Sequence, residues 1–443
     1  MNETKETTAT RADLHCHSTA SQYSKLGVQR ALGLPECATP PEEVYELAKR
    51  RGMDFVTITD HDTIDGALEL ADRDDVFLSE ELTANFRGEP RAAVHVLCYG
   101  ITPGDHEWLQ EHAADLESCA EYLRDRDITS ALAHPFYAVE APLTPRHRRR
   151  LAQIFPVWET RNGSRARELN MPAAIYIETH GGTGVGGSDD HAGVDIGRTF
   201  TETPAASSPE EFLEHIREGR ARPRGEQGSA AKWAHAAMAL ATRVLGRGEA
   251  RTPNPAAVLE MAMRVMSEGD VRRGSDGAGL GPDDARDLLE AWLGSIGMDM
   301  TPQQLLAHLQ EDGFSHADLY RRARRCHERS LEKAVQTVLE ATETGDYAGA
   351  AGTLFTSLTP AIPYAPAAAF LGKEKGKLVT RESEPERVAL VADAVGGMHG
   401  VTHTLDELRE RGVPGYEVDV IGTDPNVDRR LSAVAEVDVP FYA

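Results

Sequence analysis

Two short segments pair histidine with histidine or aspartate at a spacing that suits metal binding. His15 and His17 stand two apart in ADLHCHS, and Asp189 and His191 stand two apart in GSDDH. Residues i and i+2 of a strand point to the same side, so each pair can converge on one centre. Imidazoles with a few carboxylates suit zinc, manganese or iron. The two pairs therefore indicate chemistry at a transition-metal centre.

Four more candidate ligands lie in or at the ends of apolar, strand-like runs between these two segments: His61, Glu81, His95 and His134. Glu80 and Glu81 are adjacent, so only one of them can face inward, and we favour Glu81 because it shares its side with Thr83. Cys16, between His15 and His17, should point away from the centre. More than four ligands implies more than one ion, so we expect two or three divalent ions (Zn, Mn or Fe).

The elements that would position these residues form a β/α series. From residue 11 to about 225, apolar runs such as FVTITD alternate with helical patterns such as PPEEVYELAKRRG. This alternation predicts a mainly parallel sheet or a barrel, and seven such strands favour a closed or nearly closed barrel. In a barrel of this kind the catalytic groups lie at the carboxyl ends of the strands. The candidate ligands fall at such ends.

The remainder of the chain follows other patterns. Residues 228–357 carry apolar residues at helical spacing, which predicts a helical region, left open here as a spacer or a surface for a homo-oligomer. Residues 358–385 are rich in Pro, Ala, Gly and Lys and are interpreted as a linker. Residues 386–443 start a new α/β pattern with too few strands for a full sheet, and residues 1–10 are expected to be disordered.

Composition narrows the function classes. The chain has 443 residues and a formal net charge of −24, which argues against binding to long duplex nucleic acid. Its 5 cysteines contain no C-x-x-C pair, which argues against a disulfide framework and a zinc ribbon. The sequence has no apolar run long enough to cross a bilayer and no secretory leader pattern, so we expect a cytoplasmic protein without a transmembrane segment.

At this point the chain resembles the PHP family, named for its polymerase-associated and histidinol-phosphatase members. The matching motifs are DLHCHS, ITDHDT, HVLCYG, LAHP and GSDDH followed by IGRTFT. The resemblance implies a distorted seven-stranded β/α barrel over residues 11–225, a trinuclear metal centre and phosphoesterase activity. Carried over position by position, it assigns the metal ligands as His15, His17, His61, Glu81, His95, His134, Asp189 and His191.

One family feature is absent. Family members usually carry an Asp shortly after the H-x-H motif, whereas residues 21–37 here, SQYSKLGVQRALGLPEC, contain none. Either one metal site is changed, or Glu36 or Cys37 substitutes for that Asp.

The expected reaction is hydrolysis of a small phosphorylated substrate by in-line attack of a metal-bridging hydroxide. His134 or His191 could protonate the leaving alkoxide. A guanidinium should hold the phosphate, and Arg198 and Arg161 are the candidates because they follow strand ends.

Other functions stay open. Residues 386–443 resemble the incomplete opening of a glycosyltransferase with two facing Rossmann-like domains, and we assign this segment no catalysis. One alternative is a nuclease or phosphodiesterase acting on short oligonucleotides or nucleotides. The other is a non-catalytic metal- or phosphate-binding module that regulates an attached glycosyltransferase.

Overall fold

The structure is a computed structural model that describes residues 9–21, 35–244, 282–378, 386–392, 400–423 and 427–431. The chain divides into two compact units, Met1–Cys326 with Leu358–Leu378, and His327–Ser357 with Val379–Ala443. Most of the expected N-terminal disorder and residues 245–281 of the expected helical region lie outside the described residues. Residues 9 and 10 are not disordered, because they begin strand β1.

The first unit contains two sheets of mixed direction. The larger has the order β2-β3-β4-β5-β6, with strands Ser79–Phe86, Glu89–Tyr99, Thr129–Leu132, Val157–Asn162 and Thr183–Gly187. The smaller has the order β1-β7-β8, with strands Ala9–Ala12, Thr199–Pro204 and Arg222–Gly225. Only the β4–β5 and β5–β6 pairs of these two sheets are parallel.

The expectation of a mainly parallel sheet is therefore wrong. Strands β2 and β3 are joined by Arg87 and Gly88 alone, and Gly88 has a φ of 75°. A two-residue turn can connect only antiparallel strands, since a parallel pair needs a long crossover.

The two sheets do not close into a barrel. Isolated bridges connect Cys16 with Asp190, Val56 with Val76, and His61 with Glu81. The segments around Cys16 and His61 are thus extended beside β6 and β2 without forming long ladders.

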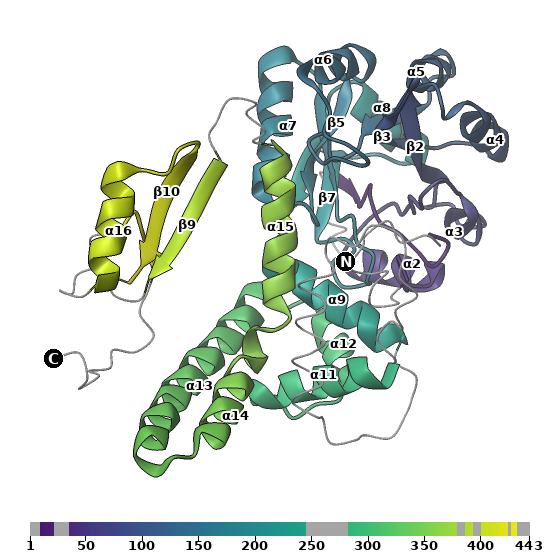
Figure 1. Ribbon diagram of the computed structural model, residues 1–443. Coiled ribbons are helices and arrows are strands. Elements are labelled where there is room, and N and C mark those ends of the chain that lie inside the picture. The colour runs from purple at the N-terminus through teal and green to yellow at the C-terminus, as the bar shows by residue number, and fades with distance from the viewer. Residues whose placement is uncertain are drawn as a thin grey trace. The chain divides into compact units, whose positions relative to one another are not determined.

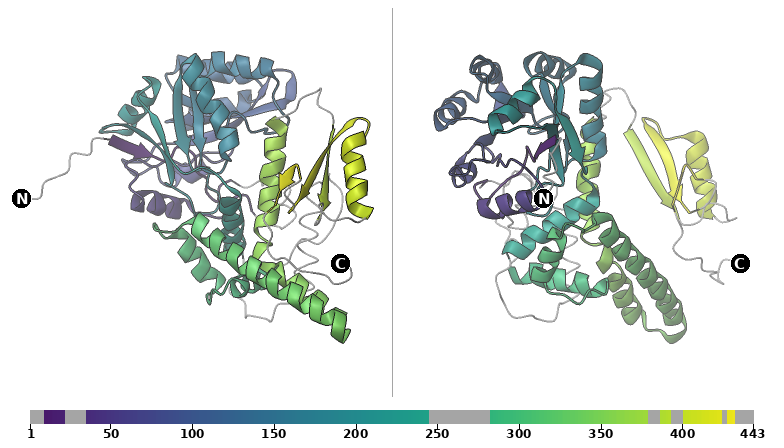
Figure 2. Two further views of the ribbon diagram at one scale, coloured as in Figure 1. Left: turned by 90° about the vertical axis from the view of Figure 1, so that its left-hand side faces the viewer. Right: turned by 180° about the vertical axis from the view of Figure 1, so that it is seen from behind.

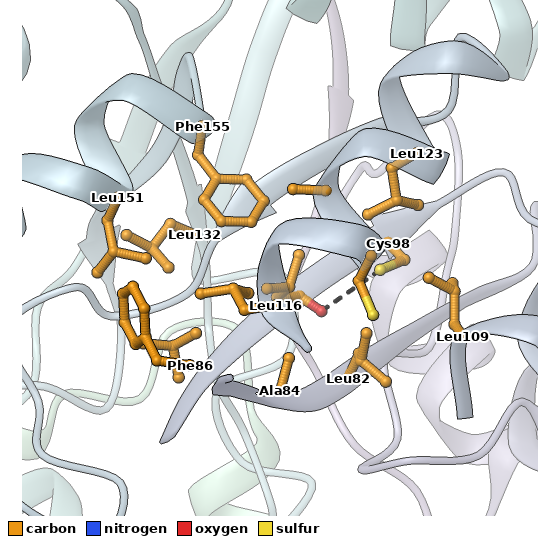
Figure 3. Packing of buried hydrophobic residues seen from close by; sticks show 14 of the residues in the cluster. Leu82, Ala84, Phe86, Cys98, Leu109, Leu116, Leu123, Leu132, Leu151 and Phe155 are labelled. Carbon is orange, nitrogen blue, oxygen red and sulfur yellow. Dashed lines mark hydrogen bonds between the residues drawn. The ribbon is translucent and has the colours of Figure 1, made fainter. Parts of the chain in front are cut away.

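Alternation along the strands separates a helix-covered face from an inner face. Leu82, Ala84 and Phe86 of β2 pack with Leu132 and Phe155 in the core that Figure 3 shows. Helices cover this face and flank the sheets: α2 (Pro41–Arg50), α3 (Asp65–Leu68), α4 (Pro103–His112), α5 (Leu116–Asp125), α6 (Pro145–Ile154), α7 (Arg167–His180) and α8 (Pro209–Arg217).

The opposite face carries the residues with chemistry. Leu97, Ala133 and Val157 form an inner apolar cluster with Phe212 of α8. Glu81, one residue before Leu82, and His95, two residues before Leu97, therefore point inward. Sequence alternation thus determines which side of the sheet bears the candidate ligands.

The expected helical region is present. It comprises α9 (Ala230–Val244), α11 (Pro282–Ser295), α12 (Pro302–Gln310), α13 (His316–Thr344) and α14 (Tyr347–Ser357). Trp292 is fully buried in a core that also includes Ala192 and Val194 from the loop that follows Asp189 and His191. Figures 1 and 2 show α9 beside α2, and Arg243 of α9 is paired with Glu43 of α2. Part of the helical region is therefore packed onto the β/α part.

The stretch interpreted as a linker is mostly ordered helix. A 3-10 turn at Thr359–Ala361 leads into α15 (Tyr364–Leu378), which runs alongside α7 in Figure 1. Tyr364, Ala367, Leu371 and Glu374 are buried. Their spacing of three to four residues gives the helix one buried face, which outweighs its Gly and Pro content.

In the second unit, the C-terminal segment forms a small parallel sheet. β9 (Glu386–Ala392) and β11 (Arg429–Arg430) flank β10 (Tyr416–Gly422), and α16 (Gly400–Arg411) connects β9 to β10. Most of the expected glycine turn lies outside the described residues. A β-α-β unit is common to many folds, so the glycosyltransferase resemblance is not shown.

Within the described residues, no single helix is long and apolar enough to span a membrane, and one bent pair, Gly349–Ala361 with Tyr364–Leu378, meets the criteria by length and composition.

Candidate metal centre

The structure brings all eight candidate ligands together. They form four overlapping triads in which the ligand atoms lie within 4.8 Å of one another. The triads are His17/His61/His191, His15/Glu81/His134, His15/His17/Asp189 and His61/Glu81/His95. Shared members link the triads, so the arrangement is one cluster with room for more than one ion.

Glu81 is the hub of the cluster. Its Oε2 lies 3.2 Å from His15 Nε2, 3.4 Å from His17 Nε2 and 3.1 Å from His61 Nδ1. Its Oε1 lies 2.7 Å from His95 Nδ1 and 3.0 Å from His134 Nε2. Both oxygens of Glu81 therefore face imidazoles and would be available to bound ions.

Glu80 points the other way, as the alternation predicts. Its carboxylate lies 2.9 Å from His106 Nδ1 and accepts a hydrogen bond from Gln110 on α4. Cys16 also points away, and its thiol donates to the carbonyl of Thr57.

Glu159 of β5 orients His15, and the sequence reasoning did not identify it. His15 Nδ1 lies 2.9 Å from Glu159 Oε1, so Nδ1 donates to that carboxylate and Nε2 is turned toward Glu81 and Asp189. A carboxylate that fixes the tautomer of a histidine in this way is typical of metal sites. The inward alternation of Val157 and Glu159 on β5 was the available signal.

The two acidic members are ionised. Burial alone would raise the pKa of Glu81, but His95, His61 and His15 hold it well below its usual range. Burial likewise opposes ionisation of Asp189, and Arg165 and His15 hold the pKa of that carboxyl well below its usual range. Both carboxylates are therefore available as anionic ligands at neutral pH.

Two members have unusual backbone conformations. His134 has a φ of 25° and Asp189 a φ of 51°, the left-handed region that non-glycine residues rarely occupy. Backbone strain of this kind concentrates at functional sites, where surrounding contacts enforce it. For His134 the enforcing contact is its backbone N–H, which donates to Glu159 Oε2 at 2.8 Å.

The region of the absent family Asp is only partly described, since residues 22–34 lie outside the described ranges. Glu36 is buried, and its Oε1 lies 3.5 Å from His61 Nε2. Cys37 instead donates its thiol to the carbonyl of His17, and burial raises its pKa. Of the two proposed substitutes, Glu36 is the one whose side chain approaches the cluster.

The structure does not bring Arg198 or Arg161 to the cluster. Arg198 donates to the carbonyls of Val194, Glu311 and Phe314. Arg161 donates to the carbonyl of Gly225. The donors of Arg198 are taken up by these backbone carbonyls, which corrects its expected role in holding phosphate.

A different arginine reaches the cluster. Arg165 is 9% exposed, its Nη2 lies 3.1 Å from Asp189 Oδ2, and its guanidinium stacks on Tyr137 at 3.9 Å from the ring centroid. Its Nε and Nη1 are buried and make no hydrogen bond within the described part of the chain. Sequence reasoning missed Arg165 because it lies three residues beyond the β5 strand.

The donor set fits divalent ions. His15 Nε2 and His17 Nε2 are buried and make no hydrogen bond with any described residue, although both face Glu81. Buried nitrogen atoms without partners cost free energy unless something binds them. Imidazole nitrogens and carboxylate oxygens are the donors that Zn, Mn and Fe accept.

Comparisons with known proteins match the part of the chain that contains Asp189 and His191. A family model described as PHP-associated matches residues 167–221, which include Asp189 and His191. An uncharacterized protein of Methanocaldococcus jannaschii is 39% identical over 59 residues, 13% of this chain and 33% of the relative. The chain therefore spans about a third of the curated relative it matches.

Three solved structures share weak similarity with about half of the chain. PsfC from Pseudomonas syringae is 16% identical over 49% of this chain and 91% of its own, with a TM-score of 0.36. An amidohydrolase from Chromobacterium violaceum with bound sulfate and no metal is 18% identical over 48% and 97%, with a TM-score of 0.34. A protein provisionally described as a metal-dependent phosphoesterase from Bifidobacterium adolescentis is 15% identical over 47% and 96%, with a TM-score of 0.30. Scores this low carry no argument about function.

Proposed function

We propose that this chain is a metal-dependent hydrolase of the PHP type that cleaves phosphate esters of small molecules. The observation that carries the proposal is the cluster of eight buried or half-buried ligand groups in four overlapping triads. Bound divalent ions would activate water for attack on phosphorus and neutralise charge on the phosphate oxygens. Two or three ions of Zn, Mn or Fe fit the donor set.

The chain's own residues divide the remaining work. Glu81 and Asp189 supply ionised oxygens, and Glu159 keeps the His15 ring in one orientation. His191 is our choice for the group that protonates the leaving alkoxide, because its side chain is 21% exposed whereas that of His134 is 3% exposed. A proton donor must reach both the leaving group and solvent.

Arg165 takes the phosphate-holding role first expected of Arg198. Its Nε and Nη1 are free of described hydrogen-bond partners, and Asp189 fixes its Nη2 beside the cluster. A buried guanidinium with unpaired N–H groups can donate to phosphate oxygens. Stacking on Tyr137 restricts the orientation of the Arg165 guanidinium.

The seven-stranded barrel belongs to the same proposal. Three contacts in series support it. Cys16 bridges to Asp190 just after β6, the backbone N–H of Thr59 donates to the carbonyl of Cys16, and His61 bridges to Glu81 of β2. We propose that these segments complete a distorted barrel of the PHP type.

The test combines metal analysis with a substrate panel. Purified protein should contain a transition metal by mass spectrometry and hydrolyse phosphomonoesters, while His15→Ala and Asp189→Asn should lose both properties. His180→Ala, an exposed histidine at the end of α7, is the matched control and should behave as wild type. Preference for dinucleotides would indicate a phosphodiesterase, and metal binding without hydrolysis of any ester would indicate a non-catalytic module.

The role of Arg165 needs its own variant. Arg165→Gln should keep its metal but lose about 10²–10³-fold in kcat/KM, the range seen when one donor to a developing charge is removed. Arg161→Gln should have little effect. Equal loss of metal and activity in Arg165→Gln would instead assign Arg165 to holding Asp189.

A further inference from the structure

We infer that the helical region positions the Asp189–His191 ligand segment and thereby sets the metal affinity of the cluster. This inference rests on the proposed metal-dependent function. It concerns helices that lie outside the β/α part and for which the sequence suggested only a spacer or a dimer surface.

A buried chain of hydrogen-bonding groups joins the helices to the ligand loop. Asp195 Oδ1 lies 2.9 Å from His316 Nε2, His316 Nδ1 lies 2.8 Å from His235 Nδ1, and His235 Nε2 lies 3.0 Å from Tyr364 Oη. The four residues come from the loop after β6, from α13, from α9 and from α15. All four are less than 9% exposed.

The acidic end of the chain sets the first hydrogen bond. The carboxylate of Asp195 can only accept, so His316 donates from Nε2. Burial and the neighbouring His316 hold the pKa of His235 well below its usual value, so His235 is neutral. One of the two facing Nδ1 atoms of His316 and His235 donates to the other, and His235 Nε2 and the Tyr364 hydroxyl form the next hydrogen bond. Each buried polar group of the chain thus has a hydrogen-bond partner, which makes the geometry specific.

Other contacts from the helices hold the same loop. Arg243 of α9 donates to the carbonyl of Ala192 at 3.0 Å, and Gln310 of α12 donates to the carbonyl of Gly193 at 2.9 Å. Arg198 donates in the opposite direction, to the carbonyls of Glu311 and Phe314. Hydrogen bonds in both directions therefore hold the loop against the helical region. The apolar packing of Ala192 and Val194 holds it as well.

Asp190 transmits this restraint to the ligands. Its carboxylate accepts hydrogen bonds from the four backbone N–H groups of Ala192–Asp195 at 2.5–3.1 Å. Its carbonyl accepts from the backbone N–H of His17 at 3.0 Å. Because Asp190 lies between Asp189 and His191 in the chain, a shift of Asp195 would move ligands on both sides of the cluster.

The Asp195 cluster is not itself a metal site. Asp195, Glu226 and His316 have a ligand-like spacing, but the ammonium of Lys232 lies 3.3 Å from Asp195 Oδ2 and 3.5 Å from Glu226 Oε2. The ammonium of Lys232 already occupies the position between these carboxylates and pairs with buried Asp195, which leaves a positioning role for this group.

The test measures Zn²⁺ affinity by competition with a chelator in the full chain. His316→Ala should weaken Zn²⁺ binding about 10–100-fold, the usual cost of losing a residue that orients metal ligands. His316→Gln, whose amide can still donate to Asp195, should restore most of that affinity. His308→Ala, a half-exposed histidine of α12 paired with Glu311, is the matched control and should bind Zn²⁺ as wild type does.

A second variant keeps the inference decidable if His316→Ala fails to fold. Gln310→Ala removes one donor to Gly193 from a half-buried side chain and should weaken Zn²⁺ about 10-fold. Circular dichroism and urea unfolding of the metal-free proteins separate affinity from stability. Wild-type Zn²⁺ affinity in folded His316→Ala would overturn the inference. If His316→Ala does not fold, wild-type affinity in folded Gln310→Ala would overturn it. A wild-type protein that binds no Zn²⁺, Mn²⁺ or Fe²⁺ would instead overturn the proposed function and this inference with it.

Discussion

A Cβ atom built on Gly187 would lie 2.4 Å from Cβ of His15 and 2.4 Å from its backbone nitrogen. The glycine at the end of β6 thus lets the first ligand segment approach the strand that leads to Asp189. Gly187→Ala should displace His15, cost about 1–3 kcal/mol in the free energy of unfolding and reduce the metal content of purified protein. Gly294→Ala on α11, where a Cβ meets nothing within 4 Å, is the control and should leave metal content unchanged. A fully metallated, wild-type-like Gly187→Ala would contradict the packing.

Metal removal should lower thermal stability. Metal bound to the folded state alone stabilises it by mass action, by about 2.7 kcal/mol at a free concentration 100-fold above the Kd. The midpoint temperature should therefore fall on treatment with a chelator and return when Zn²⁺ or Mn²⁺ is added. Differential scanning calorimetry checks this, and His15→Ala should show no response to either treatment.

Glu36 should contribute to metal binding in place of the absent Asp. Glu36 Oε1 lies 3.5 Å from His61 Nε2, so a small movement brings both to one ion. Glu36→Ala should reduce the number of metal ions per chain or weaken the most labile ion about 10-fold or more. Cys37→Ala, a change at the adjacent buried residue, should preserve both the metal count and the metal affinity. Wild-type count and wild-type affinity in Glu36→Ala would exclude Glu36.

Asp195 should make stability fall in acid. Burial alone would raise its pKa, but Lys232 and His316 lower it well below its usual value. A lowered folded-state pKa stabilises the fold above the unfolded value of about 3.9, and that stability is lost as pH falls toward the folded value.

The matching variant is Asp195→Asn. It should cost about 3–5 kcal/mol near neutral pH, because the buried Lys232 keeps only the half-exposed Glu226 as a partner charge. Its stability should also fall less steeply than that of wild type between about pH 4 and pH 2. Urea unfolding across that range measures both effects, and parallel curves for the two proteins would count against the ion pair.

The helical region should unfold with the β/α part of the first unit. Trp292 is fully buried, and its indole N–H donates to the carbonyl of Pro360 at 3.2 Å. Trp292→Ala should cost about 3–5 kcal/mol and lower the single unfolding midpoint of this unit. Ile175→Ala, on an α7 side chain that is 50% exposed, should change stability little. A separate early transition in Trp292→Ala would show that the helices unfold independently.

The sequence by itself determined the candidate ligands and the side of each strand that their side chains face. His15 and His17, and Asp189 and His191, are two residues apart, and the period of a strand is also two. Glu81 could be preferred over Glu80 for the same reason. These relationships are local, so they can be read from neighbouring residues without knowledge of the fold.

Only the tertiary structure decided which residues surround the ligands. Arg198 was expected to hold phosphate, but its guanidinium is taken by carbonyls more than 100 residues away, at Glu311 and Phe314. Arg165 and Glu159 reach the cluster because β5 lies between β4 and β6. The stretch interpreted as a linker is helix α15, because the side chains of Tyr364 and Leu371 are buried in the tertiary structure. Contacts between residues far apart in the chain depend on how the elements pack, and no local period encodes that packing.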